Sequence, residues 1–140
     1  MANQVIVSGS ITSEPELRFL NNGKPVCNFS MRLVTGAKKD GADYAPSMFL
    51  DVTAWEKLGE NVAESLKKGD RVVVTGKLTQ DEWDDKDTGQ KRTKVKIVAF
   101  EVAADLSYAT AAVNQNERSN GASSTRAPKP APAAAADPGF

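Results

Sequence analysis

The chain has 140 residues, a length that favours one domain, and its 18 basic residues balance its 18 acidic ones, so charge alone does not indicate a nucleic-acid binder. It contains no histidine, which removes the commonest general base and the commonest metal ligand, and its one cysteine, Cys27, excludes an internal disulfide and a thiolate zinc site. No stretch approaches transmembrane length and no signal peptide is recognisable, so we expect a cytoplasmic protein without metal or cofactor.

Apolar alternation, bounded by turn signals, predicts five strands, at residues 4–12, 26–35, 47–55, 70–83 and 92–103. Between the third and fourth strands, Leu58, Val62 and Leu66 recur every four residues, which predicts a helix. Its last turn would carry Lys67 and Lys68, with Gly69 just beyond as the stop.

The composition changes near residue 106. Residues 106–113 are a candidate for an extra short strand, and residues 114–140 are rich in Ala, Pro, Ser and Asn and end in "DPGF". Such a segment has too little bulky apolar surface to offset the entropy of ordering, so we expect a disordered tail behind a domain at 1–105.

The order of elements is three strands, one helix and two strands. A parallel α/β sheet needs repeated helical crossovers, which this order lacks. The order suits an all-β, five-stranded Greek-key barrel of the oligonucleotide-binding (OB) type, with one helix between the third and fourth strands. A plain β-sandwich is the structural alternative.

The polar rows of the predicted strands contain unexpected aromatics. In "SMFLDVTAW" the apolar row is Met48, Leu50, Val52 and Ala54, so Phe49 and Trp55 share the other row with Asp51 and Thr53. The polar row of residues 26–35 brings Arg32, and that of residues 70–83 brings Lys77 and Trp83. Aromatic side chains on which nucleobases stack, flanked by Lys and Arg side chains that contact phosphates, are typical of single-strand nucleic-acid binding. On the pattern alone, a strand buried on both faces explains Phe49 and Trp55 equally well.

Three long blocks then carry a resemblance. These are "VIVSGSITSEPELRFLNNGKPVCNFSM", "FLDVTAWEKLGENVAESLKKGDRVVVTGKL" and "EWDDKDTGQKRTKVKIVAFEV". In this order they resemble the bacterial and phage single-stranded DNA-binding proteins, and "ENVAESLKKGDRVVVTGKL" with "SYATAAVN" is closest to actinobacterial members or their phages. The resemblance implies an OB-fold homotetramer, not an enzyme, that coats single-stranded DNA in replication, recombination and repair. It also implies a place in the cytoplasm, on the nucleoid or in a phage-infected bacterial cell.

The resemblance also implies site residues. Phe49, Trp55 and Trp83 take the places of the family's stacking aromatics, and Lys57 and Lys68 match positions that are often basic. Where many members have another aromatic, this chain has Ala37, followed by Lys38 and Lys39, which we expect to contact DNA instead. Together with Arg32 and Lys77, these residues make up the expected nucleic-acid-binding set.

Two further departures bear on function. The residues before the hairpin tryptophan are often basic in the family, but here they are Asp81 and Glu82, which weakens phosphate attraction locally. The family's tail usually ends in a cluster of acids followed by Pro-Phe, whereas here only Asp137 is acidic and Gly139 separates Pro138 from Phe140. A partner protein that reads the C-terminus would use Asp137, Pro138 and Phe140.

Alternative functions remain. A primosome-type accessory or adaptor protein, with an OB fold and weak DNA affinity, fits the acids at 81–82 and the altered tail. A nuclease would need a metal site, which the absence of histidine disfavours. The acids in "DDKDTG" lack the later glutamate of a calcium loop, so we expect a solvated hairpin tip. Asp51 is expected to pair with a Lys or Arg on its own face.

Overall fold

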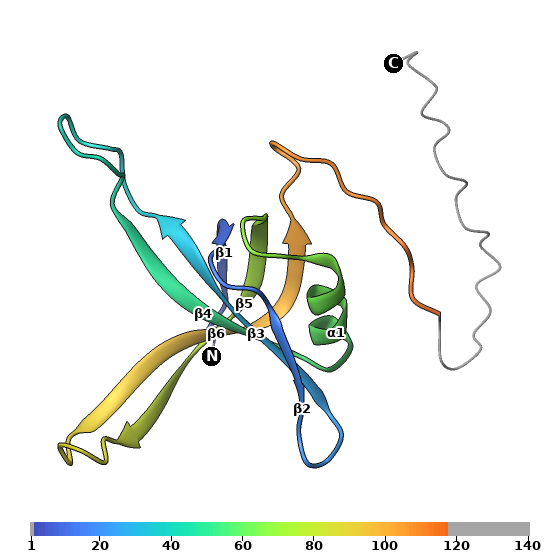
Figure 1. Cartoon of the computed structure of the whole chain (residues 1–140), viewed down its shortest axis with the longest axis horizontal. Helices are drawn as coiled ribbons and strands as arrows, with labels where there is room; N and C mark the ends of the chain where they lie inside the picture. Colours follow the sequence, from blue (N-terminus) through green and yellow to red (C-terminus); the bar gives the residue numbers. More distant parts are fainter. Residues whose placement is uncertain (1, 118–140) are drawn as a thin grey trace.

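The computed structural model describes residues 2–117 (Figure 1). In chain order its elements are β1 (Val5–Ile11), β2 (Glu16–Phe19), β3 (Pro25–Val34), β4 (Ser47–Trp55), α1 (Glu56–Ser65), β5 (Arg71–Asp84) and β6 (Lys91–Ala104). The three predicted strands before the helix and the two after it all form, and α1 lies between β4 and β5 as expected.

The strands form one sheet in the order β1-β5-β6-β4-β3-β2, and the end of β1 also pairs with β3. This extra pairing joins Ser10 to Arg32 and Ile11 to Met31, and it closes the sheet into a barrel. All the pairs are antiparallel except β4 with β6. This is the OB-type barrel that the element order predicts, and the closed sheet excludes the alternative of a plain β-sandwich. Two hairpins, β3–β4 and β5–β6, extend well beyond the barrel and splay apart (Figure 1).

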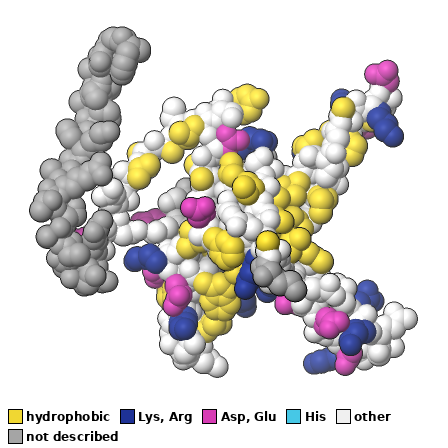
Figure 2. Space-filling model, turned by 180° about the vertical axis from the view of Figure 1, so that it is seen from behind, with side chains coloured by type: hydrophobic (Ala, Val, Ile, Leu, Met, Phe, Trp, Pro, Cys, Tyr) yellow, Lys and Arg dark blue, Asp and Glu magenta, His cyan; other side chains and the backbone are white. Residues whose placement is uncertain are grey.

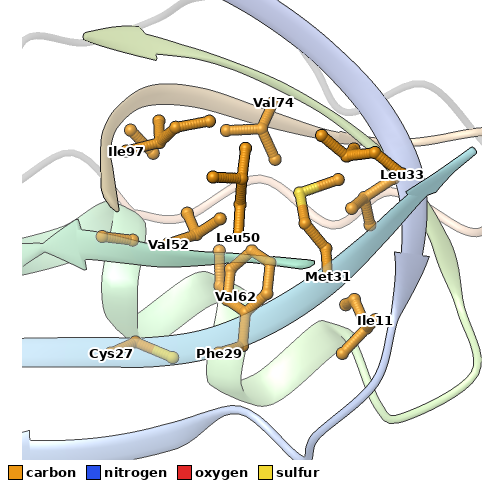
Figure 3. Close-up of a cluster of buried hydrophobic side chains, with 13 residues drawn as sticks. Ile11, Cys27, Phe29, Met31, Leu33, Leu50, Val52, Val62, Val74 and Ile97 are labelled. Carbon is orange, nitrogen blue, oxygen red and sulfur yellow. The ribbon is translucent and has the colours of Figure 1, made fainter. Parts of the chain in front are cut away.

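The core is built from the predicted apolar rows. Cys27, Phe29, Met31 and Leu33 of β3 are all buried, and so are Leu50, Val52 and Ala54 of β4. Figure 3 shows side chains of this cluster meeting from several strands, with Val62 of α1 among them. Burial raises the pKa of the Cys27 thiol, which suits a small core residue and not a nucleophile.

Helix α1 packs against β3 and β4 at very short range. A Cβ atom on Gly59 would lie 2.4 Å from the carbonyl oxygen of Ala54, so only glycine allows this approach. The chain enters the helix through Glu56, whose φ of 55° is in the left-handed region. This sharp corner fixes the end of β4, and therefore the position of Trp55.

Four features differ from the expectation. The helix ends at Ser65 with Leu66 as its C-cap, so Lys67 and Lys68 lie beyond it and not in its last turn, and Gly69, with a φ of 99°, belongs to the turn that follows and is not the helix stop. Strand β2 was not predicted, because Leu17 is the only half-buried residue in its four. Met48 belongs to the apolar row but is 45% exposed, because the β3–β4 hairpin carries it past the barrel.

The fourth difference is at residues 106–113, where the expected extra strand does not form and the chain runs through a turn and irregular backbone. The segment then returns to the helix, where the Asn61 amide Nδ2 donates to Asn116 Oδ1 at 2.9 Å. The expected disordered tail falls largely on residues 118–140, which lie outside the described residues.

Candidate nucleic-acid interface

The outer face of β3, β4, β6 and β5 carries the polar rows singled out in the sequence. Arg32 of β3 lies opposite Phe49 of β4, and Ser30 lies opposite Asp51. Asp51 in turn lies opposite Lys96 of β6, and Lys96 lies opposite Thr79 of β5. Because paired residues of neighbouring strands point to the same side, these side chains form one continuous outer surface.

The three predicted aromatics are exposed at different places on this surface. Phe49 is 64% exposed, Trp55 is 41% exposed and Trp83 is 48% exposed. Phe49 has Arg32 as its cross-strand neighbour, and Trp83 has Arg92. The barrel core does not absorb them, so the reading in which β4 is buried on both faces is wrong for Phe49 and Trp55.

A fourth aromatic on the outer surface was missed. Phe100 of β6 is 52% exposed and lies at a bulge, where Thr75 pairs with Glu101 but Gly76 pairs with Ala99. Val98 pairs with Thr53, and Phe100 and Trp55 each lie two residues further along their parallel strands. Both side chains therefore leave the outer face at the same end of β4 and β6. The signal was present in the sequence: with Ile97 and Ala99 in the core, Phe100 must point outward.

The centre of the face is occupied by four charged residues, which we call the charge cluster: Asp51, Asp81, Lys94 and Lys96. Lys94 Nζ forms an ion pair with Asp51, and Lys96 Nζ lies 3.0 Å from Asp81 Oδ2. The pairs run diagonally, since the direct cross-strand neighbours are Asp51 with Lys96 and Asp81 with Lys94. Each lysine thus has one carboxylate opposite it and another on the diagonal. The expected partner of Asp51 is therefore Lys94.

Asp51 is the best-anchored member of the cluster. It accepts a hydrogen bond from Ser30 Oγ, with 2.7 Å between Oγ and Oδ1. Partial burial favours the neutral acid, but the hydrogen bonds from Lys94 and Ser30 and the charges of Lys94 and Lys96 outweigh it and lower the pKa of Asp51. Asp51 is therefore a carboxylate at neutral pH, and its negative charge lies between the predicted stacking positions Phe49 and Trp55.

A shallow open groove crosses the face beside the charge cluster and reaches the unpredicted strand β2. Its lining includes Arg18 of β2 and Asn28 of β3, as well as the four cluster residues. Thr53 Oγ1 donates to Asn28 Oδ1 at 2.8 Å, which satisfies a buried hydroxyl on the groove floor. The groove is polar and mixed in charge, and Figure 2 shows the same mixing of basic and acidic side chains on the back of the molecule.

The predicted basic residues fall into two groups. Arg32 and Lys77 lie on the outer face, where Arg32 Nε donates to Ser47 Oγ at 3.2 Å and Lys77 lies opposite Val98. The other predicted bases are off this face. Lys38 and Lys39 are in the loop at the tip of the β3–β4 hairpin, at residues 35–46 (Figure 1).

Lys57 and Lys68 are also outside the strands. Lys57 is in the first turn of α1, with its Nζ 3.4 Å from Glu60 Oε1. Lys68 lies in the turn after the helix, and its backbone N–H donates to Glu14 Oε1 at 3.2 Å. The structure therefore does not bring these two lysines to the charge cluster.

Other expected features stand as follows. At the β5–β6 hairpin tip, Asp85 accepts a hydrogen bond from the backbone N–H of Asp87 and pairs with Arg92, as a solvated turn would. Within residues 2–117 no group of three or more acidic or cysteine side chains could hold a metal ion. In the same residues no helix is long and apolar enough to cross a membrane. Asp137, Pro138 and Phe140 lie outside the described residues.

Comparison with known proteins places the chain in a family. Over 134 residues it is 39% identical to the single-stranded DNA-binding protein of Mycobacterium tuberculosis, covering 91% of this chain and 79% of that one. The corresponding protein of Mycobacterium leprae is 40% identical over 124 residues, with 84% and 71% covered. That of Paenarthrobacter aurescens is 38% identical over 123 residues, with 83% and 69% covered. Residues 2–105 match the family model as well, and the chain belongs to the single-strand binding protein family.

Proposed function

We propose that this protein binds single-stranded DNA without sequence preference and protects it during replication, recombination and repair. The observation that carries the proposal is the set of exposed aromatics on the outer strand face of an OB barrel, within a family named for this binding. It acts as a binding protein and not as an enzyme.

Bases would stack on Phe49, Trp55 and Trp83. An aromatic platform of this kind contributes about 1–3 kcal/mol per base and tolerates every base, because each has a π-face. Phe100, which leaves the face at the same end as Trp55, extends the set to four. Strands hold these rings more firmly than loops would, so less entropy is lost when the DNA binds.

Phosphates would be contacted around the aromatics by Arg32, beside Phe49, and by Lys77, on the same outer face. Where the bound DNA leaves the sheet, it would be contacted by further lysines. These are Lys38 and Lys39 at the hairpin tip, and Lys57 and Lys68 near the helix. Each phosphate neutralised releases counterions, so the affinity falls as salt rises.

The chain would act as a homotetramer, as the family resemblance implies. Within the described residues, Val5–Gly9 of β1 has a strand partner on one side only, which leaves an edge open to a second copy. Ile6 on that edge is 69% exposed. The apolar side chains Met48, Leu78 and Val95 are also exposed on the two long hairpins. Self-association would bury these surfaces, and sedimentation velocity should give four times the chain mass.

Replication and repair proteins would reach the complex through the C-terminus. Asp137, Pro138 and Phe140 would bind a partner's pocket that accepts an aromatic ring and a carboxylate. The setting would be the cytoplasm of a bacterial cell, where Cys27 stays reduced, whether on the nucleoid or during phage infection.

The proposal is tested by titrating the protein with oligo(dT) while recording tryptophan fluorescence. Stacking on Trp55 and Trp83 should quench the emission, and the affinity should fall linearly with salt on a log–log plot. The same oligonucleotide annealed to its complement is the control and should bind far more weakly. An unchanged emission at low salt, with no binding by an independent method, would overturn the proposal.

A second candidate is an adaptor protein that keeps the barrel but binds DNA weakly. It is favoured by the acids Asp81 and Glu82 beside Trp83 and by the ion-paired lysines of the charge cluster. A dissociation constant for oligo(dT) weaker than about 100 μM at physiological salt, in the range of non-specific contact, would favour the adaptor.

A further inference from the structure

The charge cluster occupies the middle of the surface on which the proposed function places the DNA. It holds two carboxylates and two ammonium groups, so its net charge is zero. Lys94 and Lys96 are the lysines of β6 on that surface, and both are engaged by carboxylates. By contrast, neither Arg32 nor Lys77 is in an ion pair among residues 2–117. The lysines nearest the centre of the face are therefore the ones whose ammonium groups are in ion pairs with carboxylates.

The geometry makes each carboxylate a rival of phosphate. A phosphate oxygen that approaches Lys94 must take the position of Asp51, or lie beside it and be repelled. Moving Asp51 aside would also break its 2.7 Å hydrogen bond from Ser30 Oγ. If Lys94 turns from Asp51, its other carboxylate neighbour is Asp81, directly across from it on β5. Lys96 is in the same position with the two acids exchanged.

We propose that Asp51 and Asp81 limit the affinity of this protein for single-stranded DNA by competing with phosphate for Lys94 and Lys96. The inference rests on the proposed binding of single-stranded DNA and adds a feature of this chain's own residues. In the wild-type complex, stacking of the nucleobases and contacts from the Lys and Arg residues outside the charge cluster hold the DNA, and Lys94 and Lys96 contribute little. The affinity for DNA is therefore lower than the number of Lys and Arg residues on the face suggests. The bound DNA is easier to displace as a result.

The test uses isosteric variants in the full-length chain. Asp51→Asn removes the negative charge but keeps an oxygen that can accept from Ser30, and Asp81→Asn does the same beside Lys96. Each variant should bind oligo(dT) about three- to tenfold more tightly at low salt, as expected for one charge near a phosphate on an exposed face. The double variant should gain more than either single one.

The salt dependence separates released lysines from a general change in charge. Each lysine that gains a phosphate should steepen the slope of log affinity against log salt by about 0.7, the value for single strands. Glu64→Gln is the matched control, because Glu64 is an exposed carboxylate of α1 away from the face. It removes the same charge and should leave the slope unchanged.

A double-mutant cycle assigns the effect to its lysine. In a Lys94→Ala background, Asp51→Asn should have a clearly smaller effect, because the ion-pair partner of Asp51 is gone and only Lys96, directly opposite it, remains to be released. An effect of the same size with and without Lys94 would contradict the competition and indicate a long-range charge effect. Weaker or equal binding by both aspartate variants, with the wild type binding normally, would overturn the inference by showing that the acids position the lysines.

The two proposals fail in distinguishable ways. If neither the wild type nor any variant binds oligo(dT), the proposed function is wrong, and this inference falls with it. If the wild type binds and the variants gain affinity only because their oligomeric state changes, the inference alone is wrong. Light scattering on each variant provides that control.

Discussion

Phe49→Ala is the most informative single truncation on the proposed binding face. The ring is 64% exposed on strand β4 and its neighbour across the strands is Arg32, so its loss should hardly disturb the barrel core. We expect the free energy of unfolding to change by no more than about 0.5 kcal/mol, as for other surface substitutions.

The effect on binding should be far larger. One stacked base is worth about 1–3 kcal/mol, which corresponds to an affinity about 5- to 150-fold weaker for oligo(dT). The assay is the tryptophan titration, because Phe49→Ala leaves both reporters, Trp55 and Trp83, in place. The two curves should be compared at the same salt concentration.

Tyr108→Ala provides the matched control. Tyr108 is also a highly exposed aromatic, but it lies beyond the end of β6 and not on the strand face. Its truncation should leave the affinity unchanged. If Phe49→Ala also binds within about 0.5 kcal/mol of the wild type, Phe49 is not a base platform and the stacking argument fails for the residue with the best exposure.

Three further predictions follow from the same geometry. Phe100→Ala should weaken binding of oligo(dT) by about five- to tenfold, measured by the same titration, and an unchanged affinity would remove Phe100 from the binding face. Gly59→Ala should lower the free energy of unfolding by about 1–3 kcal/mol in urea melts, because its Cβ would lie 2.4 Å from the Ala54 carbonyl oxygen. Gly36→Ala is the control and should be tolerated, because its Cβ would lie 3.6 Å from Pro46 Cγ, an ordinary contact. The lowered pKa of Asp51 means that its ion pair stabilises the fold above the unfolded-state pKa of about 3.9 and that this contribution is lost as the pH falls through the lower folded-state pKa. Asp51→Asn should therefore be less stable than the wild type by up to about 1 kcal/mol at pH 7, and the difference should shrink as the pH falls below the unfolded-state pKa; a difference that stays constant on acidification would contradict the pairing.

The barrel was predictable because its core strands alternate strictly. Phe29, Met31, Val52 and Ala54 are in the core as their parity requires, and the helix between β4 and β5 follows from a change of period at Leu58. Strand β2 was missed because "ELRF" is too short and too polar to show a period, and it forms by pairing with β3. The exposure of Met48 was missed because the length of a hairpin beyond the barrel is a property of the closed fold.

The site was predictable in its aromatics and not in its charges. Phe49, Trp55 and Trp83 could be chosen from row parity and family resemblance, and all three are exposed. The charge cluster depends on the register of the β5–β6 hairpin against β4, a strand that is distant from β6 in the sequence, and no local pattern encodes this register. Asp51 had a predicted ion-pair partner of the right type, but the parallel pairing of β4 with β6 puts Lys96 directly opposite it, and only the side-chain contact identifies the partner as Lys94.

The central claim is that single-stranded DNA runs over the outer face of β3, β4, β5 and β6. Photocrosslinking with oligo(dT) that carries 5-iodouracil at single positions, followed by peptide mapping, tests this most directly, because the crosslink forms where a base stacks on an aromatic ring. The account predicts crosslinks at Phe49, Trp55, Trp83 and Phe100. Crosslinks confined to aromatics away from this face, such as Tyr108, would contradict it.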